Sequence, residues 1–129
     1  MMSGQKLLFV DDEKAVLTVL ERSFSSLGYA VHTAGSGESA LKVLRAEEIH
    51  VMFFDLNMPG MSGLELCRQV KAERPMALIF ALTGYAGLFE LSECREVGFD
   101  DYFQKPVDLK LLHTIVQDAM DKQRRWKTG

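Results

Sequence analysis

The chain has 129 residues, 47% of them hydrophobic, and a formal net charge of −3 at pH 7. This length is common for a single domain, which can bury roughly two thirds of its unfolded surface without disulfides. The mild charge excludes an overall basic field for nucleic acid or anionic lipid, and the longest apolar run is far shorter than the ~20 residues that span a bilayer.

Short apolar runs alternate along the chain with segments of helical periodicity, which predicts βα units and a parallel sheet. The runs are continuously apolar, as expected for strands that helices cover on both faces. The predicted strands are, in chain order, Lys6–Val10, Tyr29–Ala34, Val51–Asp55, Ala77–Thr83 and Asp101–Gln104.

The helical segments fall between and after these strands. Apolar residues recur in them at helical spacing, least regularly in the fourth segment. Ser36 and Asp108 are candidate N-caps, and Gly28 is a candidate C-terminal stop. The predicted helices are Lys14–Leu27, Glu38–Ala46, Ser62–Glu73, Leu88–Val97 and Leu109–Arg125.

These elements predict one α/β domain over residues 1–129, with a core of about 6–122. The expected architecture is a three-layer sandwich, in which five helices cover a five-stranded parallel sheet. Right-handed crossovers with a reversal after the second strand give the strand order 2-1-3-4-5. The two cysteines, Cys67 and Cys94, lack any CxxC or Cys/His ligand spacing, which indicates reduced thiols and a cytoplasmic location. Because the apolar runs are short, we expect no membrane partner.

Four of the predicted strands end on residues that can handle a phosphoryl group. Asp11 and Asp12 follow the first strand, Asp55 ends the third, Thr83 ends the fourth, and Lys105 follows the fifth. The carboxyl ends of parallel strands share one edge of the sheet, where ligands of open α/β sheets bind. The sequence therefore predicts three carboxylates, a hydroxyl and an ammonium in one crevice.

Three neighbouring carboxylates repel one another, and their pKa values rise unless a cation intervenes. Mg²⁺ is the expected cation, because it prefers oxygen ligands and often combines one or two carboxylates with water and a phosphoryl oxygen. The motifs hold no His or Cys, which counts against zinc. Asp55 stands alone before a turn-rich loop that can expose the carbonyl of Asn57, so we assign nucleophilic attack to Asp55 and metal binding to Asp11 and Asp12.

The remaining polar residues have assigned roles at this edge. Lys105 is expected to contact the phosphoryl oxygens, or to pair with Asp55 when the site is empty. The Lys105-Pro106 bond is a candidate cis peptide, which for an X-Pro bond is the minority form. The hydroxyl of Thr83 can donate to a new phosphoryl oxygen.

Taken together, these motifs resemble the receiver domain of bacterial two-component response regulators, which has a flavodoxin-like fold. The matching segments cover nearly the whole chain and follow one another at separations usual for the family. They are Asp11-Asp12-Glu13, Asp55-Leu56-Asn57-Met58-Pro59-Gly60-Met61-Ser62-Gly63, Thr83-Gly84 and Tyr102-Phe103-Gln104-Lys105-Pro106.

The resemblance implies that Asp55 accepts a phosphoryl group from a phosphohistidine on a sensor histidine kinase or a phosphotransfer protein. It implies that Asp12, Asp55 and the backbone carbonyl of Asn57 bind Mg²⁺ directly, and that Asp11 helps through water. Such a protein catalyses only its own phosphorylation and dephosphorylation, so we do not expect an enzyme.

The resemblance also implies a switch. Lys105 and Thr83 contact the phosphoryl group, and Tyr102 turns inward in response. Asn57 and Tyr85 occupy positions that tune phosphoryl lifetime in the family. The surface of the fourth helix, fifth strand and fifth helix is expected to change and control an unidentified effector or effector domain, with possible homodimerisation on phosphorylation.

Simpler interpretations stand beside these. Asp11 and Asp12 can cap the first helix, Thr83 can be an ordinary strand end, and Tyr102 can pack at an edge. The cations around Trp126 suit a solvated helix end, so we expect no nucleic-acid partner.

Two other functions use the same residues: a phosphorylation-independent adaptor, and a phosphohydrolase with an aspartate nucleophile. Phosphohydrolases of the haloacid-dehalogenase type carry a second Asp two places after the nucleophile, where this chain has Asn57. A flavin-binding flavodoxin is disfavoured, because no Ser/Thr/Gly-rich phosphate loop follows the first strand.

Overall fold

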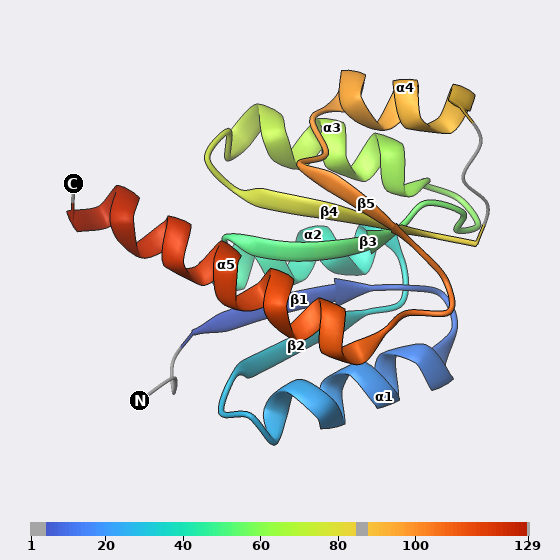
Figure 1. Ribbon diagram of the computed structural model, residues 1–129. Helices are drawn as coiled ribbons and strands as arrows, with labels where there is room; N and C mark the ends of the chain where they lie inside the picture. Colours follow the sequence, from blue (N-terminus) through green and yellow to red (C-terminus); the bar gives the residue numbers. More distant parts are fainter. Residues whose placement is uncertain (1–4, 85–87, 129) are drawn as a thin grey trace.

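The computed structural model describes residues 5–84 and 88–128. A five-stranded parallel sheet in the order β2-β1-β3-β4-β5 lies between two layers of helices (Figure 1). The strands are β1 (Lys6–Val10), β2 (Ala30–Ala34), β3 (Val51–Asp55), β4 (Leu78–Thr83) and β5 (Asp101–Gln104). The helices are α1 (Lys14–Ser25), α2 (Gly37–Ala46), α3 (Gly63–Glu73), α4 (Leu88–Val97) and α5 (Leu109–Thr128). The predicted fold class and strand order are confirmed.

The element boundaries differ from the predicted ones by up to three residues. β2 and β4 each begin one residue late, because the N–H of Tyr29 bonds to the carbonyl of Phe24 and the N–H of Ala77 bonds to that of Arg74. These residues close turns instead of joining the sheet. α1 ends at Ser25, before a left-handed turn at a glycine, and α5 continues to Thr128.

Side-chain caps precede α2, α3 and α5, and the sequence predicted those of α2 and α5. The hydroxyl of Ser36 accepts a hydrogen bond from the N–H of Ser39, and the carboxylate of Asp108 accepts one from the N–H of Lys110. Such caps satisfy N–H groups that have no partner inside the helix. Both predicted N-caps are therefore confirmed, as is the turn at Gly28, where φ is +97°.

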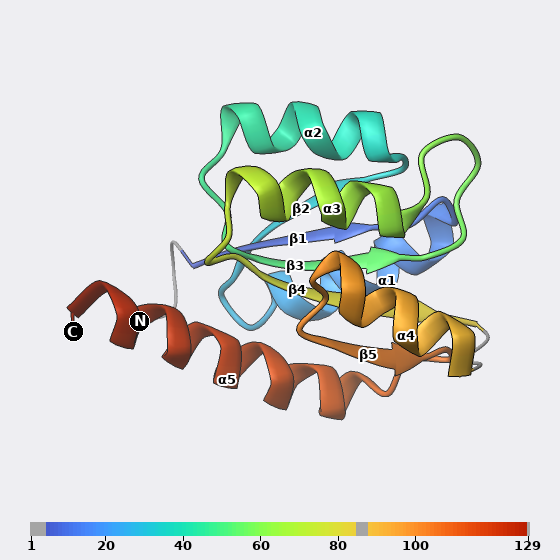
Figure 2. The ribbon, with the colours of Figure 1, turned by 90° about the horizontal axis from the view of Figure 1, so that it is seen from above.

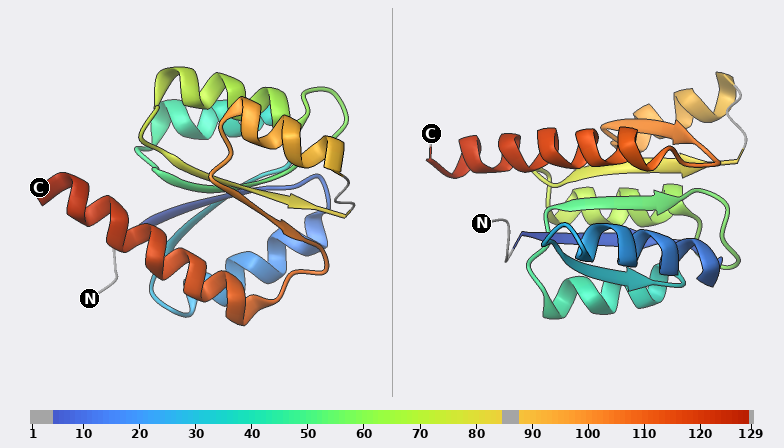
Figure 3. Two further views of the ribbon diagram at one scale, coloured as in Figure 1. Left: turned by 45° about the horizontal axis from the view of Figure 1, so that its top comes forward. Right: turned by 60° about the horizontal axis from the view of Figure 1, so that its bottom comes forward.

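The helices divide between the two faces of the sheet. α1 and α5 cover one face and α2, α3 and α4 the other (Figures 2 and 3). The last turns of α5 extend past the N-terminal ends of the strands. Each face has its own apolar core, and every residue of β3 is buried. This double coverage explains the continuously apolar strands. Among the described residues, none of the helices combines the length and apolar character that a membrane span needs.

Three phenylalanines form a row across the centre of the sheet on its α1/α5 face. Phe9 of β1, Phe53 of β3 and Phe80 of β4 are paired in register. The ring centroids of Phe9 and Phe53 are 5.3 Å apart, and those of Phe53 and Phe80 are 5.0 Å apart. Aromatic pairs at these separations stabilise beyond their burial alone. The row therefore ties together the three strands whose ends carry the acidic residues and Thr83.

We predict that Phe53→Ala lowers the free energy of unfolding by about 3–5 kcal/mol, because it removes the middle ring of this row and leaves a cavity. Urea unfolding followed by circular dichroism measures the change. Val19→Ala on the exposed side of α1 is the control and should stay within about 0.5 kcal/mol of the wild type. Equal losses for the two variants would contradict the central role of the row.

Candidate functional site

The acidic residues lie together at the carboxyl ends of β1 and β3. Val10 and Phe54 are paired in register on these adjacent strands, so Asp11 and Asp55 leave the sheet at the same level. One carboxylate oxygen from each of Asp11, Asp12 and Asp55 lies within 4.8 Å of the others. Parallel pairing alone thus brings residues more than forty positions apart into one cluster.

Burial distinguishes the three carboxylates. Asp11 and Asp55 are 1% and 5% exposed, whereas Asp12 is open to solvent. The Asp11 carboxylate accepts a hydrogen bond of 2.9 Å from the N–H of Glu13, which is the N-cap residue of α1. Neither Asp11 nor Asp12 is the N-cap residue, so the simpler interpretation of the pair as a helix cap does not describe this structure.

Lys105 supplies the positive charge of the site. Its ammonium nitrogen lies 2.7 Å from Asp11 Oδ2, 3.6 Å from Asp55 Oδ1 and 3.7 Å from Glu13 Oε1. The predicted pairing with Asp55 is present, but Asp11 is the closer partner. Asp11 is the more buried carboxylate, and a short contact to the ammonium offsets the loss of its hydration.

These surroundings raise the pKa of both Asp55 and Lys105, which favours the neutral form of the first and the charged form of the second. Burial, followed by the charge of Asp11, raises the pKa of Asp55 to about 6, although Lys105 and the N–H of Asn57 oppose the shift. Burial would lower the pKa of Lys105, but its hydrogen bond to Asp11 and the charges of Asp11, Asp55 and Glu13 outweigh it and raise that pKa. The ammonium is therefore held charged while Asp55 resists ionisation.

The loop after Asp55 is fixed by backbone contacts at both ends. The N–H of Leu56 bonds to the carbonyl of Leu82 at 3.1 Å, and the N–H of Gly63 bonds to the carbonyl of Leu56 at 3.0 Å. Inside the loop, the N–H of Asn57 points to Asp55 Oδ1 at 3.4 Å. The side chain of Asn57 is exposed.

The other predicted site residues lie on β4, on β5 and just after it. Thr83 is buried at the end of β4, and its carbonyl accepts a hydrogen bond of 2.7 Å from the N–H of Lys105. Tyr102 is half-buried against the core. The Lys105-Pro106 peptide bond is cis, as the sequence suggested. Tyr85 lies outside the described residues.

Two residues at the site received no role from the sequence. Glu13, the third acid after β1, completes the carboxylate set around Lys105. Gly63 starts α3 against the backbone of Asp55, because a Cβ there would lie 2.2 Å from the Asp55 carbonyl oxygen. The run of three acidic residues after β1 could have suggested the role of Glu13. The spacing of residues in the sequence does not indicate the close approach of Gly63 to Asp55.

The cluster suits a hard divalent cation. Three carboxylate oxygens converge, and neither nitrogen nor sulfur ligands belong to the group, which matches the oxygen preference of Mg²⁺. A hollow beside Asp11 and Asp12 is lined by Leu17 and Thr18 of α1, so the cluster is open toward this helix.

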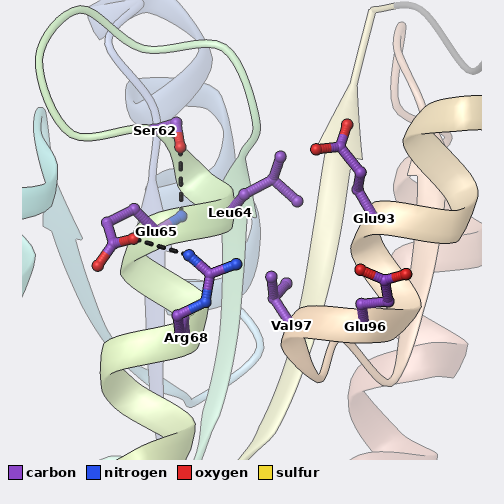
Figure 4. A pocket seen from close by; sticks show the side chains of 7 residues that line it. All are labelled: Ser62, Leu64, Glu65, Arg68, Glu93, Glu96 and Val97. Carbon is purple, nitrogen blue, oxygen red and sulfur yellow. Dashed lines mark hydrogen bonds and ion pairs between the residues drawn. The ribbon is translucent and has the colours of Figure 1, made fainter.

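A second pocket lies between α3 and α4, away from the cluster. Figure 4 shows Glu65 bonded to Ser62 and Arg68 on one wall, with Glu93 and Glu96 on the other. None of its lining residues was predicted to belong to the site.

Comparison with known proteins shows which family and which relatives have a similar sequence. The model of the family described as "Response regulator receiver domain" matches residues 7–117. The virulence sensor protein BvgS of Bordetella pertussis is 35% identical over 122 residues, which cover 89% of this chain and 10% of BvgS. The alkaline phosphatase synthesis transcriptional regulatory protein PhoP of Bacillus subtilis is 36% identical over 88% of this chain and 48% of PhoP. The chain thus spans about half or less of the length of these relatives.

Solved structures share the fold. The response regulator receiver domain protein (CheY-like) from Methanospirillum hungatei has a TM-score of 0.89 at 29% identity, covering 94% of this chain and 97% of that one. The BeF3-activated DrrB receiver domain has a TM-score of 0.84 at 32% identity, covering 94% and 99%.

Because the folded state raises the pKa of Asp55, it favours the protonated carboxyl. This stabilising preference is complete at pH values below the ordinary pKa of 3.8 and is lost as the pH rises through about 6. We predict that Asp55→Asn gains stability relative to the wild type between pH 4 and pH 7.5, by roughly 2 kcal/mol in EDTA. Chemical unfolding over this pH range measures it. Asp118→Asn on the exposed side of α5 is the control. A pH-independent difference for Asp55→Asn would contradict the raised pKa that burial and the charge of Asp11 give this carboxyl.

We further predict that Gly63→Ala lowers the free energy of unfolding by about 3 kcal/mol, because the new methyl group meets backbone atoms that no rotamer change can move. Thermal or urea unfolding tests this. The matched control is Gly84→Ala, where a Cβ meets no atom within 4 Å. Wild-type stability in Gly63→Ala would show that the two backbones separate easily.

Proposed function

This chain belongs to the response regulator receiver domain family, and we propose that it is a phosphoacceptor that receives a phosphoryl group on Asp55. We infer that one receiver domain, with its core over about residues 6–122, carries this function. The observation that supports it most directly is the meeting of Asp55 with Asp11, Asp12 and Lys105 at one edge of the sheet.

In the proposed reaction, a carboxylate oxygen of Asp55 attacks the phosphorus of a phosphohistidine on a partner. The new P–O bond forms as the P–N bond breaks, and the leaving imidazole nitrogen keeps the electron pair and takes a proton. Lys105 lies 3.6 Å from Asp55 Oδ1, where its charge can also contact the incoming phosphoryl oxygens. Ionised Asp55 is the nucleophile, and a cation beside it would oppose the raised pKa of the metal-free site and favour this charged form.

Asp12, Asp55 and the backbone carbonyl of Asn57 are the residues that would hold Mg²⁺, with Asp11 assisting through water. Bound there, Mg²⁺ would neutralise the carboxylates and the charge of the transferring group. Asn57 and Tyr85 are proposed to tune the lifetime of the product.

The proposed output begins at Thr83 and Lys105. New negative charge on Asp55 attracts the Thr83 hydroxyl and the Lys105 ammonium, and Tyr102 turns inward, which changes the surface of α4, β5 and α5. To change the ratio of active to inactive molecules from 1:99 to 99:1, phosphorylation must favour the active form by about 5.5 kcal/mol.

The proposed partners are a sensor histidine kinase or phosphotransfer protein as donor, and an effector or effector domain as target. Relatives such as PhoP are about twice as long as this chain, which supports an output outside the receiver. Homodimerisation of the phosphorylated form is one proposed consequence. Receiver domains are generally not enzymes, and we propose no activity beyond the protein's own phosphorylation and dephosphorylation.

We predict that the protein gains the mass of one phosphoryl group when it is incubated with Mg²⁺ and acetyl phosphate, and that EDTA abolishes the gain. Asp55→Asn should show none, and Lys105→Ala should show much less. Intact-mass spectrometry measures all of these. Asp118→Asn serves as the folded control that should label like the wild type.

A wild type that stays unlabelled while a known receiver labels in the same tube would overturn the proposal. Sustained turnover of a phosphate ester, with many equivalents of free phosphate released per protein, would instead favour the phosphohydrolase. Equal affinity of Asp55→Ala and wild type for a partner would favour the phosphorylation-independent adaptor.

A further inference from the structure

The first residue of α2 makes an unusual contact with the loop that follows Asp55. Gly37 is buried directly after the capping residue Ser36. A Cβ placed on Gly37 would lie 2.6 Å from Met61 Sδ and 2.9 Å from both Met61 Cβ and Met61 Cγ. Real side chains essentially never approach this closely, so Met61 occupies the space that any side chain at position 37 would need.

A change of rotamer cannot relieve this contact completely. Methionine is flexible, and its Sδ and Cγ can swing aside. The Cβ of Met61, however, is attached to the backbone, so its position moves only with the chain. A methyl group at position 37 must therefore displace either the first turn of α2 or the backbone of residues 56–62.

The first turn of α2 is the better anchored of the two. Its Ser36 hydroxyl accepts from the N–H of Ser39, the N–H of Ala40 bonds to the carbonyl of Ser36, and Ala40 is fully buried. Within the part of the chain that the structure describes, the backbone groups of residues 58–61 make no hydrogen bond. The middle of this loop is held by side-chain packing, so it is the part that yields.

Met58 and Met61 supply that packing. Met58 is buried in the core of the α2/α3/α4 face, and Met61 packs against its edge. The loop ends are fixed at Leu56 and Gly63, and Gly60 turns the chain between them at a φ of +76°. Asn57 lies on the stretch between the fixed end and these two methionines.

We propose that Met61 latches the 56–62 loop onto the first turn of α2, and that this latch positions the backbone carbonyl of Asn57 beside Asp55 for Mg²⁺. Gly37 is the positioning residue that makes room for the latch. The inference rests on the proposed function, because it assigns a role toward the cation of that site. Residues that orient metal ligands typically change metal affinity by 10–100-fold when they are altered.

Helix propensity and the Met61 contact predict opposite effects of Gly37→Ala on stability. Alanine is more favourable than glycine in a helix by up to about 1 kcal/mol, so without the latch Gly37→Ala would stabilise the protein or leave it unchanged. With the latch, the same change displaces Met61. A loss in Gly37→Ala therefore reports the contact and not the conformational freedom of glycine.

The test measures Mg²⁺ binding to the full chain by isothermal titration calorimetry, with MgCl₂ as the probe and thermal unfolding recorded in parallel. Gly37→Ala should weaken Mg²⁺ binding roughly tenfold. Met61→Ala should also weaken it, because the loop loses its latch. In the double variant Gly37→Ala/Met61→Ala, the released loop can move away from the new methyl group, so we expect no further loss relative to Met61→Ala. The control is Gly35→Ala just before α2, where a Cβ meets no atom within 4 Å, and it should bind like the wild type.

Several results would overturn the latch. One is wild-type Mg²⁺ affinity in Gly37→Ala, and another is a lowered melting temperature with unchanged affinity, which would mean a structural role alone. Additive losses in the double variant would also overturn it, since independent sites add. Should Gly37→Ala fail to fold, an unchanged affinity in Met61→Ala refutes the latch by itself. A wild type that binds no Mg²⁺ would instead refute the proposed function, so the two failures are distinguishable.

Discussion

The repulsion among three carboxylates within 4.8 Å of one another governs this end of the molecule. Among the described residues, the Lys105 ammonium pairs with two of them, at 2.7 Å from Asp11 and 3.6 Å from Asp55. Asp11 therefore has a close permanent partner, whereas Asp55 is buried with only partial compensation, which its raised pKa expresses. The carboxylate with the least compensation is the one that gains most from a bound cation. The electrostatics thus single out Asp55 without reference to its place in a motif.

Such a cluster persists only if the surrounding fold enforces it, because buried like charges favour local opening. The enforcement comes from the sheet. β3 is buried along its whole length, and the Phe9, Phe53 and Phe80 rings hold β1, β3 and β4 in register below the site. Apolar packing at the centre thereby fixes polar groups at the edge. The parts that can respond to charge are the loops beyond the strand ends, where packing and single hydrogen bonds replace the sheet.

Sequence reasoning succeeded where one physical rule decides the outcome. Continuous apolar runs and helical periodicity placed every element, and right-handed crossovers with a reversal after the second strand then gave the strand order. It also indicated which residues reach the shared edge, since strand ends converge in any parallel sheet. It missed the preference of Lys105 for Asp11, because a difference of less than 1 Å between two acceptors depends on burial that spacing does not encode. It missed the contact of Gly37 with Met61 for a related reason. The first residue of α2 meets a loop residue, and only the assembled backbone shows that a side chain at position 37 would need the volume that Met61 fills.

The ends of β4 and β5 are tied by a bond that constrains how any signal could leave the site. The N–H of Lys105 donates to the carbonyl of Thr83 at 2.7 Å, so the two residues that we propose contact the phosphoryl group share a backbone hydrogen bond. A movement of Thr83 toward Asp55 would therefore displace the backbone of Lys105 as well. A movement of the Lys105 ammonium would likewise displace the end of β4. Tyr102 lies on the short edge strand β5, three residues before Lys105, which follows that strand. Because β5 has a neighbouring strand only on its β4 side, fewer backbone hydrogen bonds oppose its displacement than oppose that of β3. A shift at the end of β5 therefore changes the surface beside α4 and α5 more readily than the core.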